Sequence, residues 1–184
     1  MRHIRGFSLI EMLVVVAILV IIVLFAHNNM SHWRKSQNAD RVVSEIIHLV
    51  HFSRNYALNQ RKAVTLCGSS DAKKCDHYWA IDMLLFVDGN KNSVIDGSES
   101  IIKVIPLKTE NSLHWNGFGG KRITFESTGI TYASNGSFTY CEADKNPLYS
   151  RQIIVSRGGR ARSSQDKNGD GFHEDTKGNI ISCP

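Results

Sequence analysis

Apolar residues fill the first part of the chain almost without interruption. From Phe7 to Ala26 there are twenty residues with no Gly or Pro and one charge, that of Glu11. At ~1.5 Å rise per residue, a helix of this length just spans the hydrocarbon core of a bilayer. A short basic stretch, residues 1–6, comes before the run. The pattern predicts a leader at 1–6 and a membrane-spanning helix over 7–26.

The hydrophobic pattern then changes to a helical period. Between Asn38 and Gln60, apolar residues recur near the spacing i, i+3, i+4, i+7, with polar residues between them. The apolar set is Val42, Val43, Ile46, Leu49, Val50 and Ala57. We therefore expect the helix to continue over 27–61 as an amphipathic segment, with its apolar face packed on a sheet.

Beyond Arg61 the pattern is that of short β-strands. Val, Ile, Phe, Tyr and Thr are enriched in runs at 63–67, 79–87, 101–107, 122–126, 130–133, 137–142 and 152–156. The turn signals Thr128-Gly129, Asn135-Gly136 and Gly158-Gly159 separate some of these runs. Residues 62–184 should form a β-rich globular domain, and the fold class should be α+β, with the long helix on antiparallel strands.

Two features distinguish the apolar run from a secretory signal peptide. Bulky Phe25 and then His27 follow the run, where a signal peptide has the small residues of its cleavage site. The small residue, Gly6, lies before the run instead. A carboxylate such as that of Glu11 costs a few kcal/mol inside a membrane helix, so it needs a partner. Cleavage after Gly6 would create an α-amino group at Phe7, one helical turn from Glu11.

The segment Gly6-Phe7-Ser8-Leu9-Ile10-Glu11, followed by an apolar run, resembles the processing site of type IV pilins and type II secretion pseudopilins. The resemblance implies cleavage by prepilin peptidase between Gly6 and Phe7, and N-methylation of Phe7. It also implies that Glu11 neutralises the terminal amine of a neighbouring pilin subunit during assembly. A plain single-span membrane anchor is the alternative interpretation.

The same resemblance implies a location. The leader would face the cytoplasm, the span would cross the inner membrane once before assembly, and the globular domain would be periplasmic and then extracellular in a pilus. The even number of cysteines agrees with export to an oxidising compartment. They are Cys67, Cys75, Cys141 and Cys183.

Four cysteines allow three disulfide pairings. We favour Cys67–Cys75, which closes a short polar loop, and Cys141–Cys183, which ties the end of the chain back to the domain. A zinc site is the alternative, but the chain has no C-x2-C pair to support it.

The segment from Cys67 to Glu99 resembles the FimT and GspH branch of minor pilins and pseudopilins. A polar loop between Cys67 and Cys75 is followed by Trp79, Phe86 and a stretch rich in Asp and Asn. The fold implied for this branch is an N-terminal helix packed against two small antiparallel sheets.

The stretch rich in Asp and Asn is also a weak candidate for calcium. Its oxygen-bearing residues stand at positions 1, 3, 5, 9 and 12 of a calcium-loop template, and they are Asp88, Asn90, Asn92, Asp96 and Glu99. Position 6 is Ser93, where the template requires Gly. A second stretch, 166–174, has Gly171 in place but lacks the final Glu, because position 12 is Lys177. Polar turns have the same composition, so we predict neither a cofactor nor a structural metal.

Basic residues gather near the end of a mildly basic chain, whose 22 Lys and Arg against 17 Asp and Glu give a net charge of +5. Residues 151–167 hold five cations and one carboxylate, that of Asp166, which leaves a local balance of +4. The five cations are Arg151, Arg157, Arg160, Arg162 and Lys167.

The two glycines of Gly158-Gly159 can form a hairpin turn that sets Arg157 opposite Arg160. Strand alternation then puts Arg160 and Arg162 on one face, about 6.6 Å apart at ~3.3 Å per residue. This is near the spacing of successive phosphates on one strand of nucleic acid, and guanidinium groups bind phosphate through paired hydrogen bonds. Neutral donors follow at Ser163, Ser164 and Gln165.

The run Gly159-Arg160-Ala161-Arg162 resembles the Gly-Arg-x-Arg motif of FimT proteins. The resemblance implies binding of extracellular DNA during natural transformation, with Arg160 and Arg162 as the contacts. We place Gly159, Arg157 and Lys167 in the same DNA-binding site.

Lys121 and Arg122 are additional candidates for DNA contact. The alternative function is structural: a minor pilin or type II secretion pseudopilin that primes assembly of the filament. We expect no enzyme, because the chain has no recognisable Ser-His-Asp set and no Gly-rich phosphate loop beside a helix.

Overall fold

The computed structural model describes residues 8–97, 99–107, 109 and 111–184. The chain divides into two compact units, Met1–Gln37 and Asn38–Pro184, and one long helix, α1 (Leu9–Gln60), contributes residues to both. The strands are β1 (Val64–Ser69), β2 (Asp82–Val87), β3 (Ile101–Pro106), β4 (Ser112–Gly117), β5 (Arg122–Phe125), β6 (Gly136–Cys141), β7 (Arg151–Val155) and β8 (Ala161–Ser163), with a short 3₁₀ helix, η1 (Pro147–Tyr149), before β7.

The N-terminal unit begins its helix at a capped end. The Ser8 hydroxyl accepts a hydrogen bond from the backbone N–H of Glu11 at 3.3 Å, which is one half of a capping box whose other member is a Glu or Gln at this position. Apolar side chains from Leu9 to Leu24 are exposed in this unit.

Over the part of the chain described here, no helix combines the length and apolarity needed to cross a membrane. The predicted leader (1–6) and the first residue of the predicted span, Phe7, lie outside the described residues. The membrane span over 7–26 stays a prediction.

Within the second unit, α1 buries one face completely. Val42, Ile46, Val50 and Ala57 have no exposed surface, as expected for the apolar stripe of an amphipathic helix. The helix ends at Gln60 because Arg61 adopts the left-handed conformation (φ 52°), which stops the helical hydrogen bonding.

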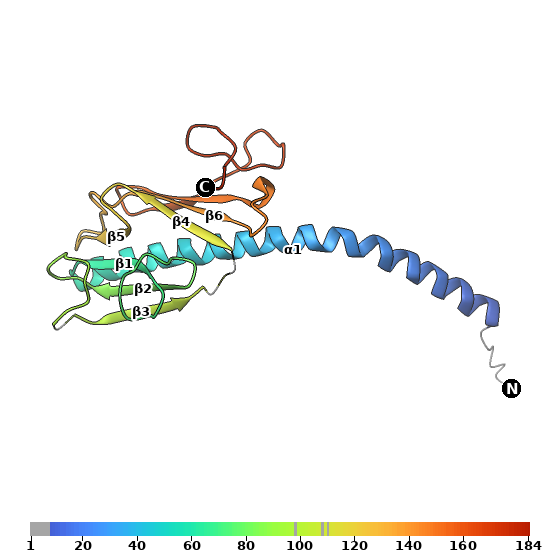
Figure 1. Cartoon of the computed structure of the whole chain (residues 1–184), viewed down its shortest axis with the longest axis horizontal. Helices are drawn as coiled ribbons and strands as arrows, with labels where there is room; N and C mark the ends of the chain where they lie inside the picture. The colour runs from blue at the N-terminus through green and yellow to red at the C-terminus, as the bar shows by residue number, and fades with distance from the viewer. Residues whose placement is uncertain (1–7, 98, 108, 110) are drawn as a thin grey trace. The chain divides into compact units, whose positions relative to one another are not determined.

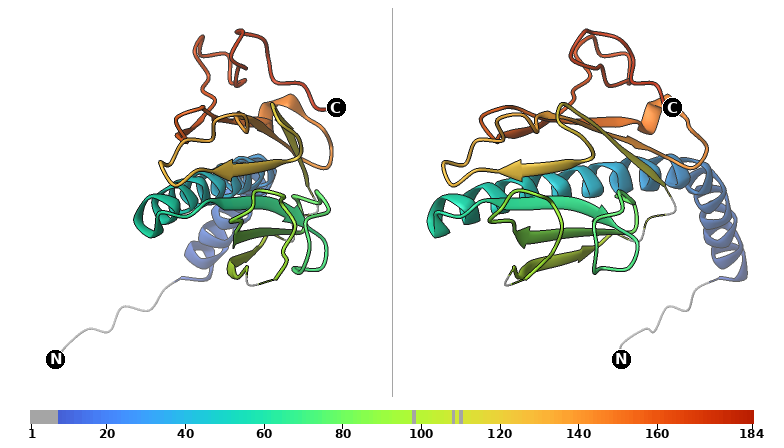
Figure 2. Two further views of the ribbon diagram at one scale, coloured as in Figure 1. Left: turned by 90° about the vertical axis from the view of Figure 1, so that its left-hand side faces the viewer. Right: turned by 60° about the vertical axis from the view of Figure 1, so that its left-hand side comes forward.

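The strands form two antiparallel four-stranded sheets on either side of this helical segment (Figures 1 and 2). The first sheet has the order β3-β2-β1-β5 and the second has the order β4-β6-β7-β8. Side chains from the helix and from both sheets form one core that includes Ile46, Leu85 and Phe138. The structure confirms the expected α+β fold of a long helix on two small antiparallel sheets.

An aromatic cluster fills the core between the sheets. The Phe138 ring lies 4.8 Å from Trp79 and 4.6 Å from Trp115, measured between ring centroids. Trp79 lies in a turn that directs its ring into this cluster. For this reason the strand predicted over 79–87 begins at Asp82.

Two further strand expectations differ from the structure. The strand predicted over 130–133 is absent: Tyr132 is left-handed (φ 44°), and Ser134 N–H donates to the Thr131 carbonyl at 2.7 Å in a turn. Conversely, β4 was not expected from its polar sequence. It forms because Leu113 and Trp115 face the core while β6 satisfies its backbone.

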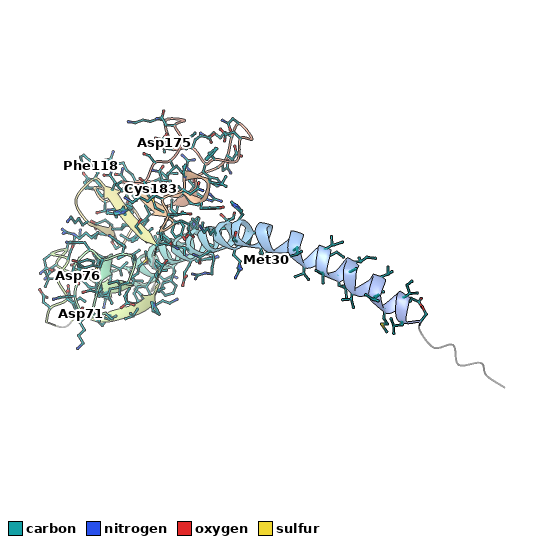
Figure 3. All side chains as sticks on the ribbon, turned by 45° about the vertical axis from the view of Figure 1, so that its right-hand side comes forward. Met30, Asp71, Asp76, Phe118, Asp175 and Cys183 are labelled. Atoms are coloured by element: carbon teal, nitrogen blue, oxygen red, sulfur yellow. A yellow bond between two sulfur atoms is a disulfide. The ribbon has the colours of Figure 1, made fainter. Side chains whose placement is uncertain are left out.

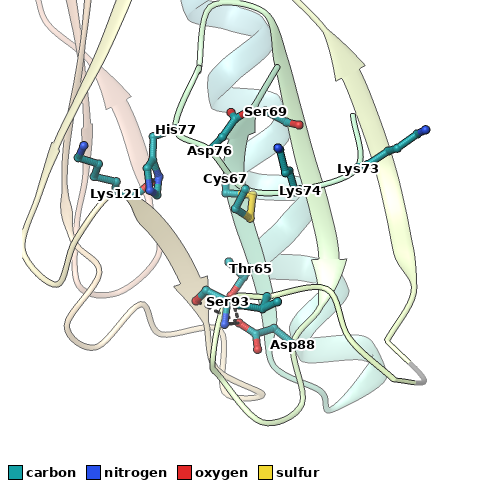
Figure 4. The surroundings of a disulfide bond; sticks show 12 residues. Thr65, Cys67, Ser69, Lys73, Lys74, Asp76, His77, Asp88, Ser93 and Lys121 are labelled. Atoms are coloured by element: carbon teal, nitrogen blue, oxygen red, sulfur yellow. Dashed lines mark hydrogen bonds between the residues drawn. A yellow bond between two sulfur atoms is a disulfide. The ribbon is translucent and has the colours of Figure 1, made fainter. Parts of the chain in front are cut away.

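The structure joins Cys67 to Cys75 and Cys141 to Cys183, the pairing favoured by the sequence analysis. Figure 4 shows the first disulfide at the base of the 67–75 loop, with Lys74 beside it and Lys73 pointing away. The second disulfide fastens the C-terminal segment, residues 164–184, to the end of β6.

The two disulfides should contribute unequally to stability. Replacing Cys141 and Cys183 with Ser, which opens a separation of 42 residues, should lower the free energy of unfolding by about 4 kcal/mol in the chain-entropy model. Replacing Cys67 and Cys75, which are 8 residues apart, should lower it by about 2.5 kcal/mol. Denaturant unfolding of the detergent-solubilised full chain measures both; a larger loss from the shorter loop would contradict this ranking.

Candidate nucleic-acid interface

The basic C-terminal segment forms a β-hairpin from β7 and β8, which we call the basic hairpin (residues 151–163). Its loop has three residues, Arg157 to Gly159, because Ser156 N–H donates to the Arg160 carbonyl and Gly159 N–H donates to the Ser156 carbonyl, both at 2.9 Å. Arg160 therefore lies opposite Ser156. The expectation that a two-glycine turn would set Arg157 opposite Arg160 was wrong, because Gly159 takes the left-handed position of a three-residue loop.

Arg160 and Arg162 lie on the outer face of this hairpin. In the strand register Val155, which is buried, pairs with Ala161, whereas the half-exposed Ile154 pairs with Arg162. Alternation places the side chains of Arg160 and Arg162 on the face opposite the core, and both residues are exposed. Within the described residues, neither guanidinium group has a hydrogen bond or an ion pair.

The hairpin is held in place by neighbouring elements. Arg54, on α1, donates through its Nε to the carbonyl oxygens of Gly129 and Gly158 at 3.2 and 3.1 Å. Thr131 N–H donates to the Arg157 carbonyl at 2.9 Å, and the Thr131 hydroxyl donates to the Ser156 carbonyl at 3.1 Å. Sequence reasoning did not identify Arg54 or Thr131, because these contacts join segments far apart in the chain.

Gly159 has a structural role in this site. Its φ of 71° is the left-handed conformation, which a side chain disfavours. A Cβ at this position would also overlap the carbonyl oxygen of Gly129 and would lie 2.9 Å from Arg54 Cδ. The glycine of the Gly-Arg-x-Arg run therefore lets the loop approach α1 and the 129–131 turn.

The other cations of residues 151–167 divide into two groups. Arg157 and Lys167 are exposed, and Arg157 Nε donates to the Tyr132 carbonyl at 3.2 Å. Arg151, in contrast, is 5% exposed and its Nε donates to the Asp40 carboxylate at 3.0 Å. Arg151, which entered only the local charge balance of residues 151–167, is therefore paired with Asp40 and does not add a free cation to the hairpin.

Lys121 and Arg122 belong to a different region of the domain. They stand at the start of β5, in the first sheet. β5 approaches β4, which is at the opposite edge of the second sheet from β8. The structure therefore does not bring Lys121 and Arg122 together with Arg160 and Arg162.

Acidic groups of the C-terminal segment lie close to one side of the basic hairpin. A shallow hollow is lined by Arg162 and Lys167 together with Glu174 and Asp175. The backbone N–H groups of Gly171 and Gly169 lower the pKa of the nearby Asp166 carboxyl below its ordinary value. The Asp166 carboxylate is therefore charged at neutral pH, and the acidic groups lie on the Arg162 and Lys167 side of the basic hairpin.

Ser164 does not take the role suggested for it as a phosphate donor. It is 5% exposed, and its hydroxyl accepts from Gln152 N–H at 2.9 Å and hydrogen-bonds with His173 Nδ1 at 3.0 Å. Ser163 is half-buried and Gln165 is exposed, so Gln165 is the more accessible of the neutral donors.

Oxygens of the first calcium candidate accept hydrogen bonds from its own loop and from β1, and the buried Asp88 Oδ1 has no hydrogen-bond partner among the described residues. The buried carboxylate of Asp88 accepts from the Thr65 hydroxyl at 2.6 Å and from Ser93 N–H at 3.2 Å (Figure 4). Glu99 accepts from Gly89 N–H at 2.9 Å. The amide groups of Asn90 and Asn92 point at Asp96. These are the bonds of a polar turn.

The second calcium candidate does gather carboxylates. Oxygen atoms of Asp166, Asp170 and Glu174 lie within 4.8 Å of one another, the one such cluster of three acidic, His or Cys side chains within the described residues. Glu174 is buried and also accepts from Lys167 N–H at 3.0 Å. Turns in which Asp side chains accept hydrogen bonds from nearby backbone N–H groups also bring carboxylates close together. The absence of a metal here stays a prediction.

Of the three residues assigned to processing and assembly, the structure describes one, Glu11. Gly6 and Phe7 lie outside the described residues. Glu11 is exposed in the first turn of α1, and its role in assembly stays a prediction.

The long N-terminal helix, the two antiparallel sheets and the paired disulfides define a pilin-like structural protein. A family model described as Type II transport protein GspH matches residues 42–159, and the chain belongs to this family. A second model, the Prokaryotic N-terminal methylation motif, matches residues 1–26. The matches confirm the resemblance to the GspH branch, and they indicate processing by prepilin peptidase and association with other pilin subunits.

Solved structures agree with this assignment at the level of the fold. The type IV minor pilin FimU of Pseudomonas aeruginosa is similar in one crystal form with a TM-score of 0.50 and 16% identity, over 72% of this chain and 90% of that chain. A second crystal form gives a TM-score of 0.49 and 17% identity, over 68% of this chain and 92% of that chain. The fold comparison rests on the first. No curated protein matches the chain.

The two glycines of the hairpin loop should respond differently to the same substitution. Gly159→Ala should lower the free energy of unfolding by about 1–3 kcal/mol, because it combines positive φ with a backbone clash. Gly158→Ala is the matched control: its Cβ would meet nothing closer than the Ser156 hydroxyl at 3.9 Å, so the change should stay within about 0.5 kcal/mol. Thermal and denaturant unfolding of the two variants measure these changes. Equal losses of unfolding free energy would contradict the prediction that Gly159 is required by its positive φ and its contact with Gly129.

Proposed function

We propose that this GspH-family protein is a minor type IV pilin that binds extracellular DNA through the basic hairpin during natural transformation. The observation that carries the proposal is that the side chains of Arg160 and Arg162 are exposed and unpaired among the described residues. Both are exposed on one outer face, and within the described residues neither is engaged by a carboxylate. Guanidinium groups in this state keep all their donors for phosphate.

The hairpin also supports binding through its rigidity. Arg54 and Thr131 fix the loop backbone from two sides, so little backbone freedom is lost when phosphates bind. A pre-organised site spends less of its interaction energy on ordering. Two or three cations of one domain still contact only a few phosphates, so affinity should be modest, independent of sequence and strongly dependent on salt.

The N-terminal motif supplies the location in this proposal. The apolar run over 7–26 would hold the subunit in the inner membrane as a single span before assembly. After cleavage and methylation at Phe7, the helix would enter the pilus and the basic hairpin would be presented outside the cell. DNA held by the hairpin would then follow the movements of the pilus.

A structural role in the filament is the second candidate, and one feature of the first sheet favours it. The edge strand β3 leaves Ile101 and Val104 exposed, and a groove between this strand and α1 is lined by Phe52, Val104 and Lys103. An exposed edge strand beside an apolar groove is suited to contact with another subunit. This contact would be used by a pilin and by a pseudopilin of type II secretion alike.

Removing the two exposed guanidinium groups should weaken DNA binding. For the detergent-solubilised full chain, Arg160→Gln with Arg162→Gln should reduce affinity for a short duplex about 10- to 100-fold at low salt, because two charge-assisted contacts are lost. The slope of log K against log salt should fall by about 2. Fluorescence anisotropy between about 50 and 200 mM salt measures both quantities.

The matched control is Lys73→Gln with Lys74→Gln. It removes the same charge from two exposed side chains of the 67–75 loop, which lies on the first sheet (Figure 4). This control should bind DNA nearly as the unmodified protein does. If the two double variants weaken binding equally, net charge and not the basic hairpin would account for it.

Glu11 should matter for assembly through its charge. Glu11→Gln keeps a residue that is compatible with the capping box at Ser8 but removes the carboxylate that would neutralise the amine of Phe7. We expect the variant to be processed normally and to be strongly depleted from sheared pili, as measured by immunoblotting of the sheared and membrane fractions. Normal incorporation of Glu11→Gln would count against an assembly role for this charge.

A further inference from the structure

Two large aromatic side chains stand exposed on loops at the end of the second sheet where the loop of the basic hairpin also lies. Phe118, in the turn after β4, is 75% exposed, and Tyr132, in the turn that precedes β6, is 69% exposed. Figure 3 shows Phe118 at the surface of the domain. Single exposed apolar residues are common on proteins, so their significance depends on whether the two share a surface with the cations.

Backbone contacts connect the loop of Phe118 to the loop of Tyr132. Phe118 N–H donates to the Asn135 carbonyl at 2.8 Å. Gly119 approaches the Ala133 carbonyl so closely that a Cβ on Gly119 would overlap it. The two aromatic side chains therefore come from adjacent, packed turns, although they are 14 residues apart in sequence.

The loop of Tyr132 is in turn bonded to the basic hairpin. Thr131 N–H donates to the Arg157 carbonyl at 2.9 Å, and Arg157 Nε donates to the Tyr132 carbonyl at 3.2 Å. The backbone of Tyr132, whose side chain is exposed, is thus hydrogen-bonded to a cation of the proposed DNA site. We call Phe118, Tyr132 and Arg157 the aromatic edge of the hairpin.

The backbone of Tyr132 is in a conformation that few large residues adopt. Its φ is 44°, in the left-handed region where a side chain other than that of Gly, Asn or Asp is uncommon. Such strain persists only when the surroundings impose it, and it is concentrated at functional sites. Here the Thr131–Ser134 turn and the hydrogen bonds to Arg157 surround the strained residue, whose side chain is exposed to solvent.

From this arrangement we infer that the aromatic edge stacks on unpaired bases, so that the protein prefers single-stranded over double-stranded DNA. The inference rests on the proposed function, because the guanidinium groups of Arg160 and Arg162 supply the phosphate contacts. Exposed aromatic rings beside a cationic track are the arrangement that binds single strands without sequence preference. A duplex offers no unstacked base to these rings, so it would engage the cations alone.

The test uses the full chain in nonionic detergent and three DNA probes of about 30 nucleotides: an oligo-dT strand, a duplex, and a strand of the same length made of abasic units. The variant is Phe118→Ser with Tyr132→Asn, since Asn tolerates positive φ and preserves the turn. The matched control is Tyr78→Asn, which removes a tyrosine that is 60% exposed in the segment after the 67–75 loop. Thermal unfolding verifies that each variant is folded.

We expect the unmodified protein to bind oligo-dT at least about 10-fold more tightly than the duplex or the abasic strand. The aromatic variant should lose this preference and bind all three probes alike, while Tyr78→Asn should retain it. Unmodified protein that binds the duplex as well as oligo-dT would overturn the inference. So would an aromatic variant that keeps the preference, and Phe118 and Tyr132 would then be assigned to contact with another subunit.

These outcomes are distinguishable from failure of the proposed function itself. If Arg160→Gln with Arg162→Gln weakens binding to every probe while the aromatic variant changes nothing, the proposed function stands and the inference falls. If the unmodified protein binds none of the probes, both fall.

Discussion

The whole second unit depends on the burial of one helical face between two sheets. Val42, Ile46, Val50 and Ala57 are fully buried there, in one core with side chains of both sheets. Burial of apolar side chains is the dominant favourable term in such a fold. Most of the N-terminal methylation motif, matched over residues 1–26, lies on the same helix, so one element both carries this motif and organises the core.

The same helix sets the position of the basic hairpin. Arg54 extends from α1 to the carbonyl oxygens of Gly129 and Gly158, and Gly159 leaves room for that side chain. The exposed guanidinium groups of Arg160 and Arg162 are thus placed by contacts of the backbone and of other side chains. A glycine in a short basic motif can be required for geometry while its neighbours supply the chemistry.

The sequence was sufficient to predict the features that depend on local pattern. The helical period of residues 38–60, the α+β class and most of the strands follow from the alternation and spacing of apolar residues. Features that depend on contacts between distant segments could not be predicted from the local sequence pattern. β4 is a strand because β6 pairs with it, and residues 130–133 form a turn because Thr131 bonds to the hairpin. Arg151 appears available in the sequence, but Asp40, more than a hundred residues away, pairs with it.

The short strand β8 has a mechanical consequence for any load applied to the basic hairpin. It has three residues and, among the described strands, pairs with β7 alone. Tension on an edge strand of this kind would peel it away one hydrogen bond at a time. Beyond it, however, the chain is anchored covalently at Cys183 to Cys141 on β6. Peeling would therefore stop at a cross-link, and the load would pass to the interior strand β6.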